Sequence, residues 1–156
     1  MLNRHHHLAA LCIGVMIGSA HADEGKRAPR VPLSPQYRQE CSDCHVPFAP
    51  RLLPAASWQR LMSNLPNHFG TDASIDPASA REITNWLTAN AGTSKRTREA
   101  PPDDRITKAP WFIREHREIS VATWQMPTVK TPSNCAACHT QADQGDFNEH
   151  NVKIPR

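Results

Sequence analysis

The chain has 156 residues, of which 38% are apolar, and 18 Lys and Arg residues against 15 Asp and Glu residues give a net charge of +3. This length allows one domain of ordinary size or two very small ones. The charges of both signs are mixed along the chain, so no basic stripe is available and no nucleic-acid partner is expected. After residue 22, no apolar run approaches the roughly 18 residues of a membrane span. We therefore expect a mature protein that does not span a membrane.

The first 22 residues have the three parts of a secretory signal peptide. Arg4 gives a positive start, residues 8–17 are a short apolar run, and residues 20–22 put alanine at the two positions that a signal peptidase reads. Cleavage before Asp23 and localisation in the periplasm are expected. The mature chain keeps all 14 prolines and is poor in apolar side chains, so it needs a disulfide, a metal or a bulky cofactor to stabilise its fold.

Four of the five cysteines form two identical motifs, and the fifth lies in the leader. Residues 41–45 and 135–139 both read Cys-x-x-Cys-His, which is the attachment signature of c-type haem. Two thiols at this spacing reach the vinyl groups along one porphyrin edge, and the histidine that follows becomes the proximal iron ligand. The sequence predicts two haem c groups, attached through Cys41, Cys44, Cys135 and Cys138, with His45 and His139 as proximal ligands.

Two other uses of paired cysteines fit this pattern less well. The two pairs of a zinc ribbon usually lie about 15–20 residues apart, whereas the chain from Cys44 to Cys135 is several times longer. Disulfides are possible in an exported protein. Neither alternative requires a histidine after each cysteine pair, so covalent haem attachment is the favoured interpretation.

Three helices are predicted in residues 23–92, which we interpret as an N-terminal c-type haem domain. Ser34 is a helix cap before a proline, and Trp58 and Met62 share the apolar face of the next helix. Met62 is therefore interpreted as a core residue rather than an iron ligand. The helices are expected from Pro35 through the first motif, at about 55–64, and at about 77–91, the last with Gly92 as its stop.

Residues 93–105 are polar and charged and include two adjacent prolines, which is typical of a linker. Their basic cluster, Lys95, Arg96 and Arg98, is interpreted as part of a solvated connector. The segments on either side are each too small to bury a porphyrin alone. We therefore expect one body with neighbouring haems rather than two separate domains on a flexible connector.

Residues 106–156 are interpreted as a C-terminal c-type haem domain that is short and loop-rich. Pro110 should open a short helix, and residues 124–127 should form a loop because a residue before proline avoids the helical region. A helix that starts at residues 131–132 should carry the second motif and end at Gly145. The polar tail from residue 146 onwards is expected to lie across the surface.

Each iron also requires a sixth ligand, for which the mature chain offers few candidates. His68 follows the second predicted helix on a turn from which a side chain can point back. His116 lies in a charged stretch and becomes a candidate through the limited supply of ligands, while His150 is interpreted as solvated. Met126 precedes a proline, as some axial methionines do, but lies only nine residues before the second motif. At this stage His150 and Met126 remain open alternatives to His116.

The mature chain resembles the dihaem cytochrome c family of bacterial periplasmic electron carriers. The resemblance rests on residues 41–45, 58–62, 68–69, 83–87, 110–111, 116–119 and 133–139. It implies a mainly α fold with two small haem-binding domains, the first similar to monohaem cytochrome c, and two histidines on each iron. His68 would be the distal ligand of the first haem and His116 that of the second. A membrane cytochrome b as electron donor and a small high-spin c-type cytochrome as acceptor are the partners that the resemblance implies.

The chemistry of these sites predicts a function in electron transfer. An iron with both axial positions filled cannot readily bind a substrate, and the sequence contains no defensible arrangement of nucleophile and base, phosphate loop or paired catalytic carboxylates. We therefore expect a monomeric electron carrier and not an enzyme. A haem enzyme or gas-binding sensor with one five-coordinate iron is the alternative.

Overall fold

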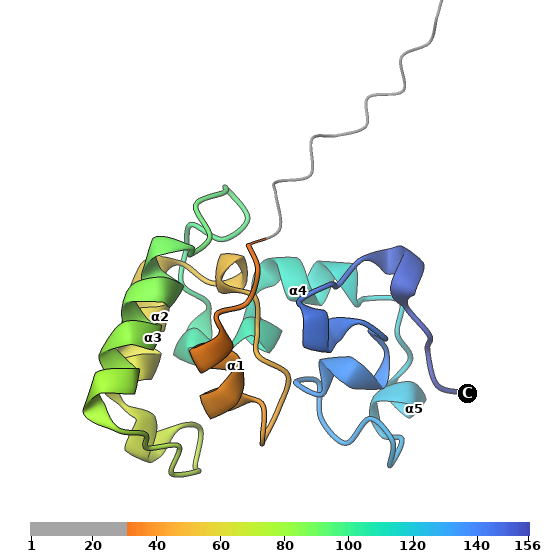
Figure 1. Ribbon diagram of the computed structural model, residues 1–156. Helices are drawn as coiled ribbons and strands as arrows, with labels where there is room; N and C mark the ends of the chain where they lie inside the picture. The colour runs from red at the N-terminus through yellow and green to blue at the C-terminus, as the bar shows by residue number, and fades with distance from the viewer. Residues whose placement is uncertain (1–30) are drawn as a thin grey trace, which may run out of the picture.

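The computed structural model describes residues 31–156 and is mainly helical, as predicted. Within this range it contains short helices, 3-10 turns and three isolated antiparallel bridges, but no extended strand. Figure 1 shows two halves side by side, with α1, α2 and α3 in one and α4, α5 and the C-terminal turns in the other. None of the helices in residues 31–156 is long and apolar enough to cross a bilayer. The predicted signal peptide lies outside the described residues.

Three α-helices build the first half, and their starts follow directly from local capping. Ser34 caps α1 (Pro35–Cys41) by accepting from the Tyr37 amide, and Asp76 caps α3 (Pro77–Ala89) by accepting from two amides of its first turn. Between them lie η1 (Pro50–Leu52), α2 (Ala55–Ser63) and η2 (Leu65–Asn67). All three predicted helices are therefore present, and the ends of α2 and α3 agree with the prediction to within two residues. The first helix was expected to carry the whole motif 41–45, but α1 ends at Cys41 and leaves the rest of the motif outside the helix.

A compact apolar core holds these helices together. Its buried members are Tyr37, Leu53, Trp58, Ile83 and Leu87. The buried polar atoms of the two aromatic side chains have partners, because the Trp58 indole donates to the Pro50 carbonyl over 2.7 Å and the Tyr37 hydroxyl donates to the Phe48 carbonyl over 3.1 Å. Met62 packs against this core, as the interpretation of its helical face predicted.

Gly92 has a different function from the helix stop that was predicted. α3 already ends at Ala89, three residues earlier. The Gly92 amide donates to the Leu53 carbonyl over 2.8 Å, and a Cβ atom at this position would lie 2.5 Å from the Arg51 carbonyl oxygen and would also clash with the Thr97 side chain. Glycine is required here because the backbone of residues 51–53 and the Thr97 side chain both come close to its Cα atom.

The second half contains two short helices around a small aromatic cluster. α4 (Pro110–Glu115) begins at the predicted proline, and Trp111 and Phe112 on it are buried. α5 (Val121–Trp124) was not predicted. A loop was predicted for residues 124–127, and this prediction was wrong at Trp124, which is the last residue of α5. Ser120 caps the single turn of α5 by accepting from the Thr123 amide.

The second motif does not lie on an α-helix, which corrects the prediction of a helix from 131 to 145. It lies on η5 (Cys135–Ala137), and η6 (Ala142–Gln144) follows and ends at Gly145 in the left-handed region at φ 70°. The Cys138 carbonyl accepts from the Lys153 amide over 2.8 Å, and the Thr140 amide donates to the Asn151 carbonyl over 3.1 Å. The C-terminal tail thus takes hydrogen bonds that a helix would have formed internally.

The tail therefore does more than lie across the surface. It includes η7 (Glu149–Asn151), and an antiparallel bridge joins Val152 to His139 in the second motif. Asp146 is only 4% exposed, and its carboxylate accepts from the Asn148 amide and the Asn151 side chain. The tail closes over the second motif through these specific contacts.

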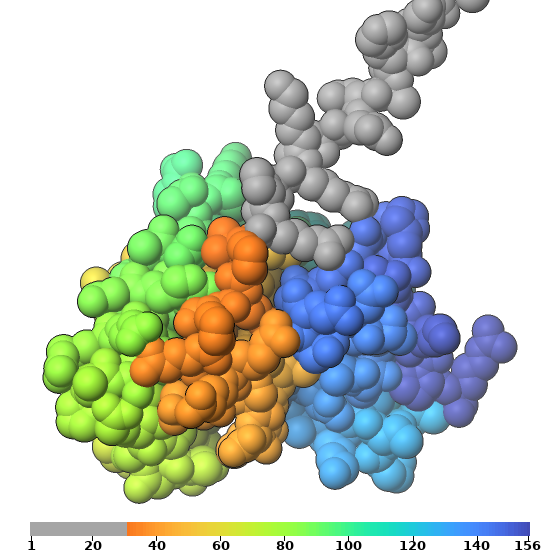
Figure 2. Space-filling view, in the orientation of Figure 1, coloured from red at the N-terminus to blue at the C-terminus, as the bar shows by residue number. Residues whose placement is uncertain are grey.

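Residues 93–105 pack against both halves rather than forming a free connector. Thr97 is buried, and Asp104 at the end of η3 (Pro102–Asp104) forms an ion pair with Arg60 of α2 over 2.6 Å. Ile106, the first residue of η4 (Ile106–Lys108), packs against the buried clusters of both halves. The space-filling view in Figure 2 shows the two halves in contact along one face, as expected for a single compact body.

Candidate functional site

The four cysteines of the two motifs lie as two separate pairs of free thiols. Burial raises the pKa of the Cys41 thiol at the end of α1 to about 11, and burial likewise raises the pKa of the Cys135 thiol in η5 to about 11. Residues 31–156 contain no cluster of three or more His, Cys, Asp or Glu side chains that could hold a metal ion. The cysteine pairs therefore do not assemble a zinc site, which usually takes four protein ligands.

His45 of the first motif faces His68 from the turn after η2. Their ring centroids are 6.2 Å apart, and the ring planes differ by 26°. The Nδ1 atom of His45 lies 2.8 Å from the Val46 carbonyl oxygen, and because that oxygen only accepts, Nδ1 carries the proton and Nε2 keeps its lone pair free. Phe48 also stacks on the His45 ring, with the centroids 4.8 Å apart.

His116 at the end of α4 faces His139 of the second motif in a similar way. Their ring centroids are 6.1 Å apart and the planes differ by 64°. The Nδ1 atom of His116 donates to the Phe112 carbonyl over 2.9 Å, so its Nε2 atom is also left with a lone pair. Phe112 stacks on His116 with the centroids only 4.0 Å apart.

The other histidine of each pair has a buried nitrogen without a partner. The Nδ1 atoms of His68 and His139 are both buried and make no hydrogen bond, an arrangement that costs free energy in a folded protein. Burial, followed by the neighbouring His45 and Arg105, lowers the pKa of His68. Burial and then His116 also lower the pKa of His139, against an opposing effect of Asp146. The lowered pKa favours the neutral form of both rings, which is the form that binds a metal.

The spacing within each pair fits a metal held between two imidazoles. A metal–imidazole nitrogen bond is about 2.0–2.1 Å and a five-membered ring has a radius of about 1.1 Å, so two trans imidazoles have centroids roughly 6.3 Å apart. The measured 6.2 Å and 6.1 Å agree with this separation. Haem iron requires only two axial donors from the protein. Each histidine pair supplies two imidazole nitrogens, and one histidine of each pair directly follows a Cys-x-x-Cys pair in the sequence. The residues therefore fit two covalently attached haems.

Of the alternative ligand candidates, His150 is exposed on η7. Met126 is half-buried in the turn after α5, and its carbonyl accepts from the Val129 and Lys130 amides. Sequence reasoning missed the aromatic neighbours of most of the site histidines. The short distance in sequence between histidine and phenylalanine could have indicated these contacts. Phe48 follows His45 by three residues, and Phe69 directly follows His68.

A mainly helical body with two Cys-x-x-Cys-His motifs, each beside a pair of facing histidines, defines the class of c-type cytochromes with two haems. The chain belongs to the dihaem cytochrome c family, whose family profile matches residues 37–147. It therefore has two haem c groups and the electron-carrier function of that family.

Solved structures agree with this assignment. The chain is 46% identical to DHC purified from Rhodobacter sphaeroides, with 73% of this chain and 96% of that chain covered and a TM-score of 0.64. A second structure, the diheme cytochrome c from the same organism, is 43% identical over 76% of this chain and 100% of that chain, with a TM-score of 0.67. The diheme cytochrome type c from Shewanella baltica OS155 is 36% identical over 80% and 95% of the two chains, with a TM-score of 0.69. No curated protein matches the chain.

Proposed function

We propose that this chain is a periplasmic electron carrier in which both irons have two histidine ligands. His45 and His68 bind the first iron, His116 and His139 bind the second, and Cys41, Cys44, Cys135 and Cys138 hold the porphyrins through thioether bonds. The haem groups supply reversible one-electron chemistry when bound. With both axial positions filled, electrons cross the protein surface without a substrate reaching the iron, so the protein acts as a carrier and not as an enzyme.

The observation that carries this proposal is the equal spacing of the two histidine pairs. Both centroid separations are those expected for a shared metal, and the hydrogen bonds to the Val46 and Phe112 carbonyls orient one imidazole of each pair. Such bonds hold the ring and make it a better ligand. The exposed position of His150 also supports His116 as the second distal ligand.

Export is supported by the composition of the leader, residues 1–22. The family match begins at residue 37, after the proposed cleavage site. We propose cleavage before Asp23, a monomeric mature protein, and the domain bounds 23–92, 93–105 and 106–156. A membrane cytochrome b is the proposed electron donor and a small high-spin c-type cytochrome the proposed acceptor.

Ligand substitutions in the holoprotein test the iron coordination. In H68A only the first iron should open, making about half of the haem high-spin and reactive with carbon monoxide. H116A should do the same for the second iron, whereas H150A and the methionine variant M126L should keep the low-spin spectrum. If H116A stays low-spin while H150A or M126L opens a site, the assignment of the second distal ligand is wrong. A high-spin component in the unmodified protein would instead support a haem enzyme or gas sensor.

A further inference from the structure

The segment 93–105 places one arginine on an aromatic side chain beside each distal histidine. The Arg96 guanidinium carbon lies 4.3 Å from the ring centroid of Trp111, and that of Arg105 lies 4.1 Å from the ring centroid of Phe69. Arg96 is exposed, as the sequence had indicated, but its guanidinium also rests on the Trp111 ring. A guanidinium over an aromatic face is held there by the cation–π interaction.

Three aromatic rings lead from Arg96 to the second centre. Trp111 lies 6.0 Å from Phe112 between ring centroids, and Phe112 stacks on His116 at 4.0 Å. Trp111 and Phe112 are 7% and 8% exposed, so the series begins just below the surface and ends on the proposed distal ligand. It is a continuous packed path from the surface to the second haem.

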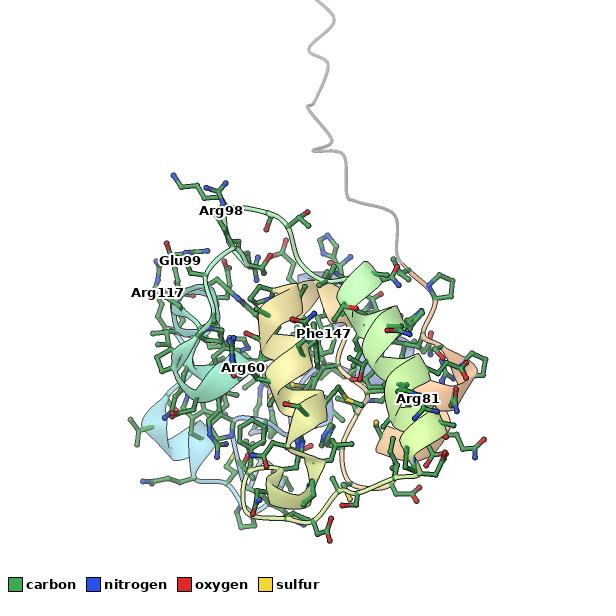
Figure 3. The ribbon with its side chains drawn as sticks, turned by 90° about the vertical axis from the view of Figure 1, so that its left-hand side faces the viewer. Arg60, Arg81, Arg98, Glu99, Arg117 and Phe147 are labelled. Atoms are coloured by element: carbon green, nitrogen blue, oxygen red, sulfur yellow. The ribbon has the colours of Figure 1, made fainter. Side chains whose placement is uncertain are left out.

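The surface above this path is basic. Burial lowers the pKa of Arg96, and the nearby Glu115 raises it. The positive charges of Arg114 and Arg51 lower the pKa of Arg96 further. A single carboxylate, Glu115, lies 3.0 Å from Arg114 and 3.9 Å from Arg96, so it cannot neutralise all three cations. Lys95, Arg98 and Glu99 are exposed in the same segment as Arg96, so they add two positive charges and one negative charge. Figure 3 shows Arg98 at the outer edge of the molecule.

The corresponding surface at the first centre is less basic, because Asp103 and Asp104 offset two of its three cations, Arg60, Arg105 and Lys108. Phe69 lies 4.8 Å from His68 and carries Arg105, but Asp103 and Asp104 adjoin it and form ion pairs with Lys108 and Arg60 respectively. The two centres therefore share the arginine on an aromatic ring and differ in the net charge around it. Of the two centres, the one below Trp111 therefore has the more basic surface.

From this difference we infer that the basic surface formed by Arg96, which lies on Trp111, and by Arg51 and Arg114 near it docks an acidic redox protein and is where the second haem exchanges electrons. The inference rests on the proposed function, because it takes His116 as an iron ligand. One electron leaves the reduced partner and converts ferric iron to ferrous, and no bond is formed or broken in this protein. The positive surface would increase the encounter rate, and the packed rings would shorten the path through which the electron tunnels.

The test uses an acidic flavodoxin in its fully reduced form as the electron donor to the oxidised holoprotein. Each flavin hydroquinone anion loses one electron and becomes the neutral semiquinone. Stopped-flow absorbance gives the second-order rate constant at low and high ionic strength. The triple variant R51Q/R96Q/R114Q should react about tenfold more slowly at low ionic strength, and the difference should disappear at high salt because the charges are then screened.

Two further variants make the test specific to this surface. Arg81 is exposed on α3, and Figure 3 shows it on the opposite side of this view from Arg98, so R81Q is the matched control for R114Q and should leave the rate unchanged. W111L should slow the reaction at every ionic strength, since it interrupts the ring series without removing a charge. If W111L does not fold, the arginine variants still test the docking surface.

The outcomes separate this inference from the proposed function. Low-spin spectra and full chemical reduction in every variant would show that the haem centres are intact. With intact centres, an unchanged rate in the triple variant, or equal slowing in R81Q and R114Q, would overturn the docking surface alone. High-spin haem in the unmodified protein would instead count against the proposed coordination.

Discussion

The two halves of this protein hold similar histidine pairs in very different ways. In the first half, the 13-residue helix α3 packs with α2 around five buried side chains. In the second, the longest helix is α4 with six residues, and the haem motif lies on a 3-10 turn that the C-terminal tail closes. The same spacing between imidazoles thus arises once from helix packing and once from backbone hydrogen bonds between loops.

This contrast indicates where each half obtains its stability. Burial of apolar side chains stabilises the first half directly. The second half has only Ala109, Trp111 and Phe112 as its buried cluster, too little for independent folding of a segment of this size. We infer that the second half depends more strongly on its covalent haem and on its contacts with the first half.

The largest effect should come from removing one haem attachment at a time. C135S/C138S should lower the intact mass of the holoprotein by one haem and abolish hydrogen-exchange protection throughout 106–156, because the porphyrin supplies the missing core. In this variant α2 and α3 should remain protected. C41S/C44S is the matched control for loss of the first haem. Continued protection of residues 106–156 without the second haem would contradict the proposed dependence.

A cavity in each half provides a second test of the comparison. Leu87 is fully buried, so L87A should lower the free energy of unfolding by about 2–5 kcal/mol. V129A, at a position 1% exposed in the second half, removes fewer carbon atoms and should cost less. Urea unfolding of the two holoprotein variants gives both values. An equal or greater loss in V129A would mean that the second half contributes as much to packing as the first.

A substitution of Gly92 tests the close packing between the first half and the segment 93–105 that follows it. In G92A the new Cβ atom would lie 2.5 Å from the Arg51 carbonyl oxygen, and relieving this overlap should cost about 1–3 kcal/mol. Thermal unfolding measures the loss, with T93A at the neighbouring exposed position as the control. A stable G92A variant would show that the segment can move away without affecting the core.

The smallest effect concerns the ion pair between Asp104 and α2. Hydrogen bonding to Arg60 lowers the pKa of the Asp104 carboxyl, so its contribution to stability is present above the ordinary carboxyl pKa near about 4 and is lost as the pH falls through the lowered value. D104N should therefore reduce stability slightly at neutral pH and make no difference at strongly acidic pH. Urea unfolding as a function of pH measures this, and a constant difference across the range would exclude a role for the charge.

Local sequence determined much of this protein. The two Cys-x-x-Cys-His motifs identified the cofactor, because thioether attachment requires a fixed short spacing. Ser34 correctly marked the start of α1, since a capping side chain acts within one turn of its own backbone. Helical periodicity, which is also a local property of the sequence, placed Met62 on the apolar face and so predicted its packing against the core.

Only the tertiary structure decided which histidines face each other. His116 lies in a charged stretch that indicates solvent exposure, yet the folded chain brings it to 6.1 Å from His139, while His150 stays exposed. The 3-10 turns of the second motif likewise depend on a tail that lies more than ten residues later in the chain and takes over its backbone hydrogen bonds. Such features rest on contacts between segments that are distant in sequence, and neither periodicity nor capping carries information about those contacts.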